Sequence, residues 1–394
     1  MGEVPRDRSD APASAGVDQP TSRRVLVAMS GGVDSAVAAA RLQQAGWEVG
    51  GVTFKLFCYG DTASGAKACC GLEGVRDAQA TARRLSIPHI VMDLSDLFRE
   101  KVYDDFAREY AAGRTPNPCV QCNTHVKFAP LLSWARRQGY EYIATGHYAR
   151  VREHRIGARS YRLIERARSD EKDQSYVLWG VPAPVLDRCF FPLGESVKPE
   201  VRREARDREL PVWDKGDSQD ICFVDDRGYA EVLRATLGAD HAVFRPGEIR
   251  DDRERVLGRH QGLAHYTVGQ RRGLGLGGGE ALHVVALETD RNVLRVGPDR
   301  QLERNGLWAS DLNLFVEPEH LTTGPVEVKI RYRHEPAAAE VRLESGRLHV
   351  RFQEAQRSIA PGQSCVVYRD GLLLGGGRID SVCQCCGDPG PYEV

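Results

Sequence analysis

The sequence predicts an α/β protein in which a doubly wound parallel sheet is followed by a small central module and a C-terminal antiparallel β-barrel. Three observations predict this order. Short apolar runs first alternate with segments of helical spacing, a Gly-rich stretch follows, and short alternating β runs fill the last part of the chain. We expect a disordered tail at 1–22, the sheet domain at 23–224, the central module at 225–305, the barrel at 306–382 and a Cys-containing tail at 383–394.

The sheet domain begins with a strand, a helix and a second strand. Residues 25–29 are an apolar run, and residues 49–54 again have strand character. Between them, Val33, Val37 and Ala40 recur at helical spacing. The alternation continues with a helix near 75–85 and with strands at 90–92 and 142–145. Strands that alternate with helices in this way form parallel β-α-β units.

The rest of the chain predicts two further units. Residues 225–298 mix one short helix with Gly-rich turns, so we interpret them as a separate module. Later runs alternate or have strand character between turn residues, at 326–332, 339–343, 348–352 and 364–368. An antiparallel sheet of about six strands removes its edges by closing on itself, which predicts a barrel.

Composition limits the classes of function. Of 394 residues, 41% are hydrophobic, which is enough for more than one core. The 54 Lys and Arg nearly balance the 55 Asp and Glu, and the net charge of -1 excludes a generally cationic coat for holding an anionic partner. No apolar run approaches the ~18 residues of a membrane helix, and residues 1–22 lack the apolar core of a signal peptide. We therefore expect a cytoplasmic protein that does not contact a membrane.

A Gly-rich loop lies between the first strand and the first helix. Its glycines let the backbone approach an anion, and the N–H groups at the helix start point toward that anion. The carboxylate of Asp34 fits beside a phosphate if a divalent cation, ordinarily Mg²⁺, lies between them. A tight turn with a helix cap is the structural alternative. The loop consists of Ala28, Met29, Ser30, Gly31, Gly32, Val33, Asp34 and Ser35.

Two cysteine-bearing motifs form a second group of candidates. Cys119 and Cys122 lie in GRTPNPCVQCN, where two prolines break regular helix, and Cys222 lies in GDSQDICF. A reactive cysteine needs thiolate near pH 7, and therefore a local positive field. The nearest cations in the sequence are Lys127, Arg114 and His125.

The remaining cysteines predict less. Eleven cysteines are too few for a disulfide scaffold in a chain of this length. Residues interpreted as packing or loop thiols are Cys58, Cys69, Cys70, Cys189 and Cys365. Three more are assigned to the tail outside the barrel, namely Cys383, Cys385 and Cys386.

Taken together, the motifs resemble a known family. SGGVDS, at residues 30–35, is similar to the pyrophosphate loop (PP-loop) of ATP pyrophosphatases, which adenylate a substrate oxygen before a nucleophile displaces AMP. With the two cysteine motifs the sequence resembles the tRNA-specific 2-thiouridylase family, and the likeness extends over residues 23–380. Further matching strings are ATGHY, KDQSY, YTVGQRRGLG, RYR and PGQS.

The resemblance implies a reaction and roles for three residues. ATP, with Mg²⁺, activates the C2 oxygen of the tRNA wobble uridine, and sulfur replaces that oxygen to give 2-thiouridine. Cys222 carries the sulfur as a persulfide received from an upstream sulfur-relay protein or cysteine desulfurase. Cys122 is its catalytic partner and forms a disulfide with it, and Asp34 acts at the nucleotide. We expect a monomer whose nucleotide site also includes Phe54 and Gly146.

The resemblance also assigns residues to the RNA. A neutral chain can hold tRNA only by local clusters of cations. Arginines are dense in one helical stretch (Arg202, Arg203, Arg206 and Arg208), in the central module (Arg271 and Arg272) and on a barrel strand (Arg331 and Arg333). The flipped uridine would border Asn117, Pro118 and Cys119. The other assigned contacts are His147, Lys172, Asp173, Gln174, Arg331, Tyr332 and Gln363, with a structural role for His147 as the alternative.

Three other interpretations stay open. Family members often have Asp where this chain has Cys119, and the resulting Cys-x-x-Cys spacing together with Cys222 would suit a [4Fe–4S] cluster with an open iron. We favour the persulfide route, and zinc lacks an evident fourth ligand. Another PP-loop tRNA-modifying ligase would not need the paired cysteines. A tRNA-binding module without catalysis would not need an intact SGGVDS loop.

Overall fold

The computed structural model describes residues 23–56, 72–217, 221–224, 228–277 and 280–383. The predicted N-terminal tail and Cys58, Cys69, Cys70, Cys385 and Cys386 lie outside these ranges. None of the helices within them is both long and apolar enough to cross a membrane.

The first domain is built on a five-stranded parallel sheet with the order β3-β2-β1-β4-β7. The buried strand β1 pairs with a neighbour on each side, which explains its uninterrupted apolar sequence. The strands are β1 (Arg24–Ala28), β2 (Glu48–Lys55), β3 (His89–Asp93), β4 (Tyr142–Thr145) and β7 (Cys189–Phe190). The flanking helices include α1 (Val33–Gln44), α2 (Leu72–Leu85), α6 (Ala129–Arg137) and α8 (Lys198–Asp207). The predicted doubly wound sheet is confirmed.

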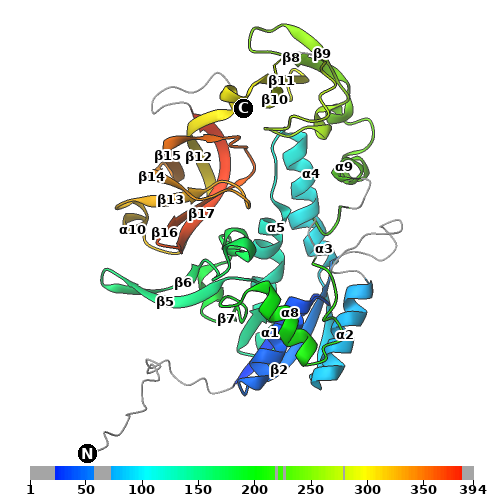
Figure 1. The fold of residues 1–394 in the computed structure, drawn as a ribbon, viewed down its shortest axis with the longest axis vertical. Helices are drawn as coiled ribbons and strands as arrows, with labels where there is room; N and C mark the ends of the chain where they lie inside the picture. The colour runs from blue at the N-terminus through cyan, green and yellow to red at the C-terminus, as the bar shows by residue number, and fades with distance from the viewer. Residues whose placement is uncertain (1–22, 57–71, 218–220, 225–227, 278–279, 384–394) are drawn as a thin grey trace, which may run out of the picture.

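A set of short helices extends from the sheet toward the other two units (Figure 1). We call α3, η1 and α4 the helical column. Its members are α3 (Ser95–Phe98), the π-helical η1 (Arg99–Tyr103) and α4 (Asp104–Ala111). Beside it lie α5 (Pro118–Gln121) and the π-helical η2 (Cys122–Lys127). Further short helices are η3 (Asp170–Lys172), η4 (Ser175–Leu178) and α7 (Ala183–Leu186).

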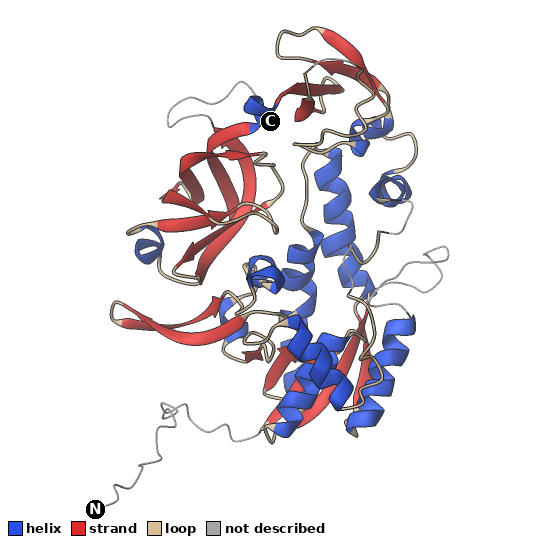
Figure 2. Ribbon diagram, in the orientation of Figure 1, coloured by secondary structure: helices blue, strands red, loops and turns tan. Residues whose placement is uncertain are grey.

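A hairpin that the sequence analysis did not predict joins the first domain to the barrel. It consists of β5 (Arg150–Ile156) and β6 (Arg159–Glu165). Strand β6 pairs antiparallel with the last barrel strand, through Glu165 opposite Leu372 and Ile164 opposite Leu373. Figure 2 shows this hairpin beneath the barrel. The first and third units therefore share one continuous eight-stranded sheet.

The central module contains a small sheet of its own, with the order β10-β11-β8-β9. Ile249, Leu263, Tyr266 and Leu294 belong to its separate core. The elements are α9 (Tyr229–Leu237), η5 (Ala242–Phe244), β8 (Gly247–Arg250), β9 (Val256–His260), η6 (Leu263–His265), β10 (Leu282–Glu288), β11 (Val293–Pro298) and η7 (Asp299–Leu302). Helix α9 contacts α4, where the rings of Tyr110 and Tyr229 stack 5.0 Å apart.

The C-terminal unit is a six-stranded antiparallel barrel closed by pairing between its first and last strands, as predicted. Its elements are β12 (Glu303–Leu314), α10 (Pro318–Thr322), β13 (Val326–Lys329), β14 (Ala337–Glu344), β15 (Arg347–Arg357), β16 (Ser364–Arg369) and β17 (Leu372–Cys383). Two details differ from expectation. Strand β13 ends at Lys329, so Arg331, Tyr332 and Arg333 lie in the turn after it and not on a strand. Cys383 ends β17 and is buried.

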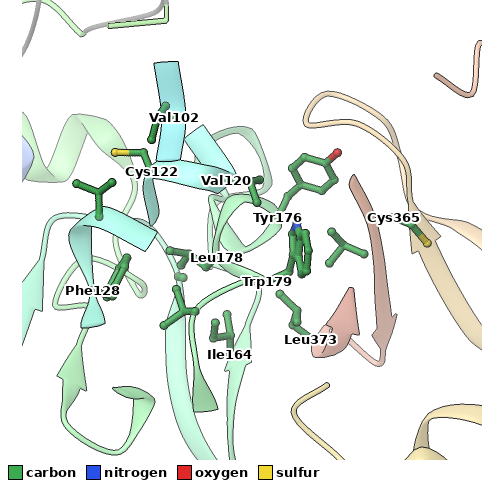
Figure 3. Packing of buried hydrophobic residues seen from close by; sticks show 14 of the residues in the cluster. Val102, Val120, Cys122, Phe128, Ile164, Tyr176, Leu178, Trp179, Cys365 and Leu373 are labelled. Atoms are coloured by element: carbon green, nitrogen blue, oxygen red, sulfur yellow. The ribbon is translucent and has the colours of Figure 1, made fainter. Parts of the chain in front are cut away.

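The main hydrophobic core continues from the helical column into the barrel. In Figure 3, Cys122 lies near Val102 on the column side, whereas Cys365 lies on the barrel side of Trp179. Polar contacts reinforce this junction. The hydroxyl of Tyr176 donates to the carbonyl of Ser364 at 3.0 Å. The barrel and the first domain thus share one hydrophobic core.

Candidate active site

The Gly-rich loop leaves strand β1 and turns directly into helix α1. Within it, the Ser30 N–H donates to Ser35 Oγ at 3.1 Å, and the Ser35 hydroxyl donates to the Gly32 carbonyl at 3.2 Å. No side chain of the described residues caps the helix at Gly32. The first N–H groups of α1 are therefore available for an anion, and the helix dipole favours negative charge there. The alternative interpretation of this loop is a tight turn with a helix cap, and the described residues contain no side chain that caps α1.

Two glycines of the site are required by close packing. Gly31 has a φ of +74°, and a Cβ there would lie 2.2 Å from the carbonyl oxygen of Gly74 in α2. A Cβ on Gly146, just after β4, would lie 2.8 Å from the Ser35 nitrogen. Both glycines thus shape the backbone at the start of α1. Phe54, also assigned to the nucleotide site, has its side chain buried in the main core.

Asp34 is held by two side chains that the sequence analysis did not single out. Lys198 Nζ lies 2.8 Å from both carboxylate oxygens of Asp34. The Tyr148 hydroxyl donates to Asp34 Oδ1 at 2.8 Å, and burial together with the Asp34 charge raises the pKa of Tyr148. A divalent cation at Asp34 would therefore share a carboxylate already paired with an ammonium group. Asp34 lies in the first turn of α1, and a carboxylate there is nevertheless the ligand type that Mg²⁺ prefers.

Lys198 also reaches the segment that carries Cys222. Its Nζ lies 2.8 Å from Asp217 Oδ1, and Asp217 stands five positions before Cys222. Lys172 and Arg202 contact the same carboxylate at 3.1 and 2.8 Å. Burial raises the pKa of Asp217, but hydrogen bonds from Lys198 and Lys172 outweigh it and lower the pKa to about 2. Asp217, in the first part of the GDSQDICF motif, is therefore tied to the Gly-rich loop by a chain of ion pairs through Lys198.

Cys122 begins the π-helical segment η2, a form that often occurs at functional sites. The preceding helix α5 starts at Asn117, whose side chain accepts from the Val120 N–H at 3.3 Å. Pro118 follows at the first helical position. Cys122 is buried and Cys119 is exposed. The two cysteines thus have different surroundings in spite of their short spacing.

The barrel holds the loop in front of these cysteines. The side chain of Gln363 donates to the carbonyls of Thr115 and Pro116 at 2.9 and 3.2 Å. The Thr115 N–H in turn donates to the carbonyl of Pro361 at 2.8 Å. The PGQS segment of the barrel therefore positions the backbone that leads into Asn117 and Cys119.

Cys222 and Cys122 both border the helical column. Phe223, the neighbour of Cys222, packs its ring against Phe98, Tyr103 and Phe106 at centroid distances of 5.9, 5.5 and 5.2 Å. Helix η2, which starts at Cys122, contacts α3 and η1 of the same column. Cys222 itself is partly buried against the main core. One set of helices therefore supports both cysteine segments.

The three cations expected to favour the thiolate form of the cysteines have different surroundings in the structure. Arg114 is committed to Glu109 through two hydrogen bonds, at 2.8 and 2.5 Å. Burial is the main cause that lowers the pKa of His125, so this imidazole is neutral near pH 7. Neither of these two observations concerns Lys127, so Lys127 stays a candidate for favouring the thiolate.

Several residues assigned to RNA make internal contacts. Asp173 is buried and accepts from the N–H groups of Ala167 and Ser175 at 2.9 and 3.2 Å. Gln174 accepts from the Tyr148 N–H at 2.9 Å. Lys172 contacts Asp217, as described above. These residues organise the loop beside the phosphate site, and their contact with RNA stays a prediction.

His147 also has a structural partner. Its Nδ1 lies 2.7 Å from the Thr145 hydroxyl, and its ring packs near Phe128 and Phe191. Burial, reinforced by the charge of Lys127, lowers the pKa of His147 to about 3. The side chain is therefore neutral at physiological pH.

The turn after β13 lies next to Tyr176 of η4, whose ring centroid is 6.3 Å from that of Tyr332. Arg331 donates to the carbonyl of Arg357 at 3.0 Å, and the Tyr332 side chain is exposed. The ammonium of Lys329, which the sequence analysis did not predict, lies 5.9 Å from the ring centroids of both Tyr176 and Tyr332. Burial lowers the pKa of Lys329. The RYR string thus lies beside η4 of the first domain.

The three-cysteine cluster is not favoured. Among the residues whose placement is described, no three His, Cys, Asp or Glu side chains are grouped so that they could hold a metal ion. Cys119, Cys122 and Cys222 all belong to this part of the chain. Their surroundings therefore do not fit an iron–sulfur cluster, and we derive no step through one.

Comparison with known proteins identifies the family. Three family models match in order: a tRNA methyl transferase HUP domain at 23–226, a tRNA methyl transferase PRC-barrel domain at 237–298 and an aminomethyltransferase β-barrel domain at 304–379. The chain is 43% identical over 362 residues to the tRNA-specific 2-thiouridylase MnmA of Pelotomaculum thermopropionicum, covering 91% of this chain and 97% of the relative. The MnmA proteins of Moorella thermoacetica and Methylorubrum extorquens are each 45% identical, covering 91% of this chain and 100% and 94% of theirs. The chain belongs to the tRNA-specific 2-thiouridylase family.

Proposed function

We propose that this chain is an ATP-dependent tRNA sulfurtransferase that converts the wobble uridine of tRNA to 2-thiouridine. The observation that carries the proposal is the charge chain from Asp34 through Lys198 to Asp217, which links the Gly-rich loop to the first residues of the GDSQDICF motif. A reaction that uses ATP and then a cysteine sulfur needs these two groups at one site. Family membership independently supports the same activity.

The first step activates the uridine. The C2 oxygen attacks the α-phosphorus of ATP, and pyrophosphate leaves toward the N–H groups at the start of α1. Gly31 and Gly32 let the backbone approach the phosphates, and Asp34 would hold the Mg²⁺ that accompanies them. Mg²⁺ supplies charge neutralisation at the leaving pyrophosphate. Oxygen at C2 then leaves as AMP, a much better leaving group than oxide.

The second step transfers sulfur. The outer sulfur of a Cys222 persulfide adds to C2, and AMP leaves. The Cys122 thiolate attacks the inner sulfur of Cys222, so that the S–S bond of the persulfide breaks and its outer sulfur remains on uridine. The products are 2-thiouridine, AMP and a Cys122–Cys222 disulfide, which an external dithiol must reduce. Both cysteine segments rest on the helical column, which supports this pairing.

The substrate and donor assignments belong to the same proposal. The tRNA anticodon arm would lie beside Asn117 to Cys119, and Arg331, Tyr332 and Gln363 would shape that place from the barrel. The persulfide would come from an upstream sulfur-relay protein or cysteine desulfurase. We propose that the enzyme acts as a monomer.

The test is nucleoside mass spectrometry after incubation with tRNA, ATP, Mg²⁺ and a persulfide donor. We expect 2-thiouridine together with AMP from wild type, no 2-thiouridine from Cys222→Ser, and retained thiolation in Cys119→Ser. Thiolation that survives Cys222→Ser contradicts the proposal. Iron bound by anaerobically purified wild type, and lost together with activity in Cys119→Ser, would favour the cluster route instead.

A further inference from the structure

Lys329, the last residue of β13, is a buried lysine to which the described residues offer no ion pair. The residue is only 7% exposed, and no described carboxylate lies within ion-pair distance of its Nζ. The ammonium instead lies 5.9 Å from the ring centroids of both Tyr176 and Tyr332. Two aromatic rings offset only part of the cost of burying a charge. This place in the fold therefore keeps a positive charge that is not fully neutralised.

The acidic group that acts most strongly on Lys329 is already engaged. Burial lowers the pKa of Lys329, and the charge of Asp173 opposes this without outweighing it. The Asp173 carboxylate accepts from the Ser175 N–H and hydroxyl at 3.2 and 2.8 Å, and it lies 3.7 Å from Arg166 Nε. Weaker contributions to the pKa of Lys329 come from Arg166, Glu335 and Asp170. An anion from outside the chain would complete the neutralisation of Lys329.

The two tyrosines connect this ammonium to the motif predicted to border the flipped uridine. Burial raises the pKa of Tyr176, and a hydrogen bond with the Asn117 side chain opposes this effect. Burial also raises the pKa of Tyr332, with further contributions from Asp173 and Cys119. Tyr332 is 38% exposed, so its ring is accessible from outside. An anion bound by Lys329 would therefore lie beside Asn117 and Cys119.

We propose that Lys329 binds an RNA backbone phosphate that flanks the flipped uridine. The inference rests on the proposed function, because it takes Asn117 to Cys119 as the place of that uridine. The exposed Tyr332 ring offers a face on which a neighbouring base can stack, and a lysine beside it supplies a point charge for a phosphate. The phosphates of ATP have the same chemistry, but the N–H groups at the start of α1 are available for them.

This role predicts a conflict between stability and binding at one position. Lys329→Met removes the buried charge and keeps an unbranched apolar side chain. The melting temperature should therefore stay the same or rise, because the charge is costly in the free protein. A lysine that served the fold through its ring contacts would lower the melting temperature when replaced.

The first test is the salt dependence of tRNA binding by the full chain, measured without ATP or a sulfur donor. One neutralised phosphate of a single strand contributes ~0.7 to the slope of log affinity against log salt concentration. We expect Lys329→Met to bind tRNA about eightfold more weakly than wild type at about 0.05 M salt, and less than about twofold more weakly at about 0.5 M. Lys215→Met is the matched control and should keep the wild-type slope, because Asp77 and Glu73 already pair with Lys215.

The second test removes the charge of the phosphate in place of that of the lysine. Two anticodon stem–loop RNAs each carry one methylphosphonate, on the 5′ or the 3′ side of the wobble uridine. One of them should bind wild type about as weakly as intact RNA binds Lys329→Met. The same RNA should bind Lys329→Met without a further loss, because the two changes remove one contact. If Lys329→Met does not fold, Lys329→Gln takes its place.

Four results would overturn the proposal. They are an equal loss of affinity at both salt concentrations, full affinity of wild type for both methylphosphonate RNAs, additive losses in the combined measurement, and no RNA binding by wild type. ATP affinity should not change in Lys329→Met; a loss of ATP affinity with unchanged RNA binding would assign the ammonium to the nucleotide and also overturn the proposal. A chain that shows the phosphate effects but makes no 2-thiouridine would sink the proposed function alone.

Discussion

The contribution of the charge chain to the free energy of unfolding can be measured most directly at Asp217. The substitution Asp217→Asn keeps the shape of the side chain and removes its charge, as protonation would. The pKa of Asp217 falls from 3.8 to about 2 on folding, because hydrogen bonds from Lys198 and Lys172 outweigh the effect of burial. A tenfold change in acidity corresponds to ~1.4 kcal/mol, so the ionised carboxylate stabilises the fold by about 2 kcal/mol at pH 7. With the side chain 22% exposed, solvent screening removes little of this.

The assay is urea unfolding of wild type and Asp217→Asn, followed by circular dichroism. Because the folded pKa is the lower one, the stabilisation is fully present above pH 3.8 and is lost as pH falls toward 2. We therefore expect the two proteins to differ by about 2 kcal/mol at pH 7 and by about half of this near pH 3. The exposed Asp214→Asn serves as control and should change stability by less than about 0.5 kcal/mol. An Asp217→Asn protein as stable as the control at pH 7, or a difference that grows on acidification, would refute the reasoning.

Three further predictions concern other parts of the molecule. Gly31→Ala should lower the melting temperature, because its Cβ would lie 2.2 Å from a carbonyl oxygen, whereas Gly32→Ala, with 3.5 Å to its nearest atom, should lower the melting temperature far less. Since burial keeps the pKa of His147 at about 3, AMP formation should show no step between about pH 5 and 8 that His147→Asn removes. Arg378→Met leaves the buried Glu109 with one guanidinium in place of two and should cost about 3 kcal/mol in urea unfolding; a cost below about 1 kcal/mol would contradict it.

The parallel sheet could be predicted because its central strands are buried. Residues 25–27 are fully or almost fully buried, and the strand that contains them has a neighbour on each side. Such strands need uninterrupted apolar residues, which are visible in one sequence. The same reasoning missed the hairpin of β5 and β6. Its sequence is rich in arginine, no residue of β5 is buried, and its partner, β17, lies more than 200 positions away along the chain.

The site could be predicted only where its residues are adjacent in sequence. SGGVDS and the two cysteine motifs are continuous strings, and their roles follow from the family that these strings resemble. Lys198 is different, because it lies 164 positions from Asp34 and belongs to a helix rich in other cations. Neighbouring arginines drew attention to that helix as an RNA surface, and nothing local marked the lysine. Tyr148 was part of a matching string, but its contact with Asp34 also depends on the fold.

Positioning and contact must be separated before RNA roles are assigned to the barrel. The side chain of Gln363 donates hydrogen bonds to the backbone carbonyls of Thr115 and Pro116, just before the predicted uridine contacts. Losing that amide would therefore move the cysteine loop even if Gln363 never touches RNA. The Thr115 N–H bond to Pro361 and the shared sheet of β6 and β17 fix the barrel against the first domain. It follows that the barrel helps to position the loop at Thr115 and Pro116, which leads into Cys119 and Cys122. Weakened tRNA binding in a barrel variant is therefore evidence of RNA contact only when Cys122 keeps its reactivity in the absence of tRNA.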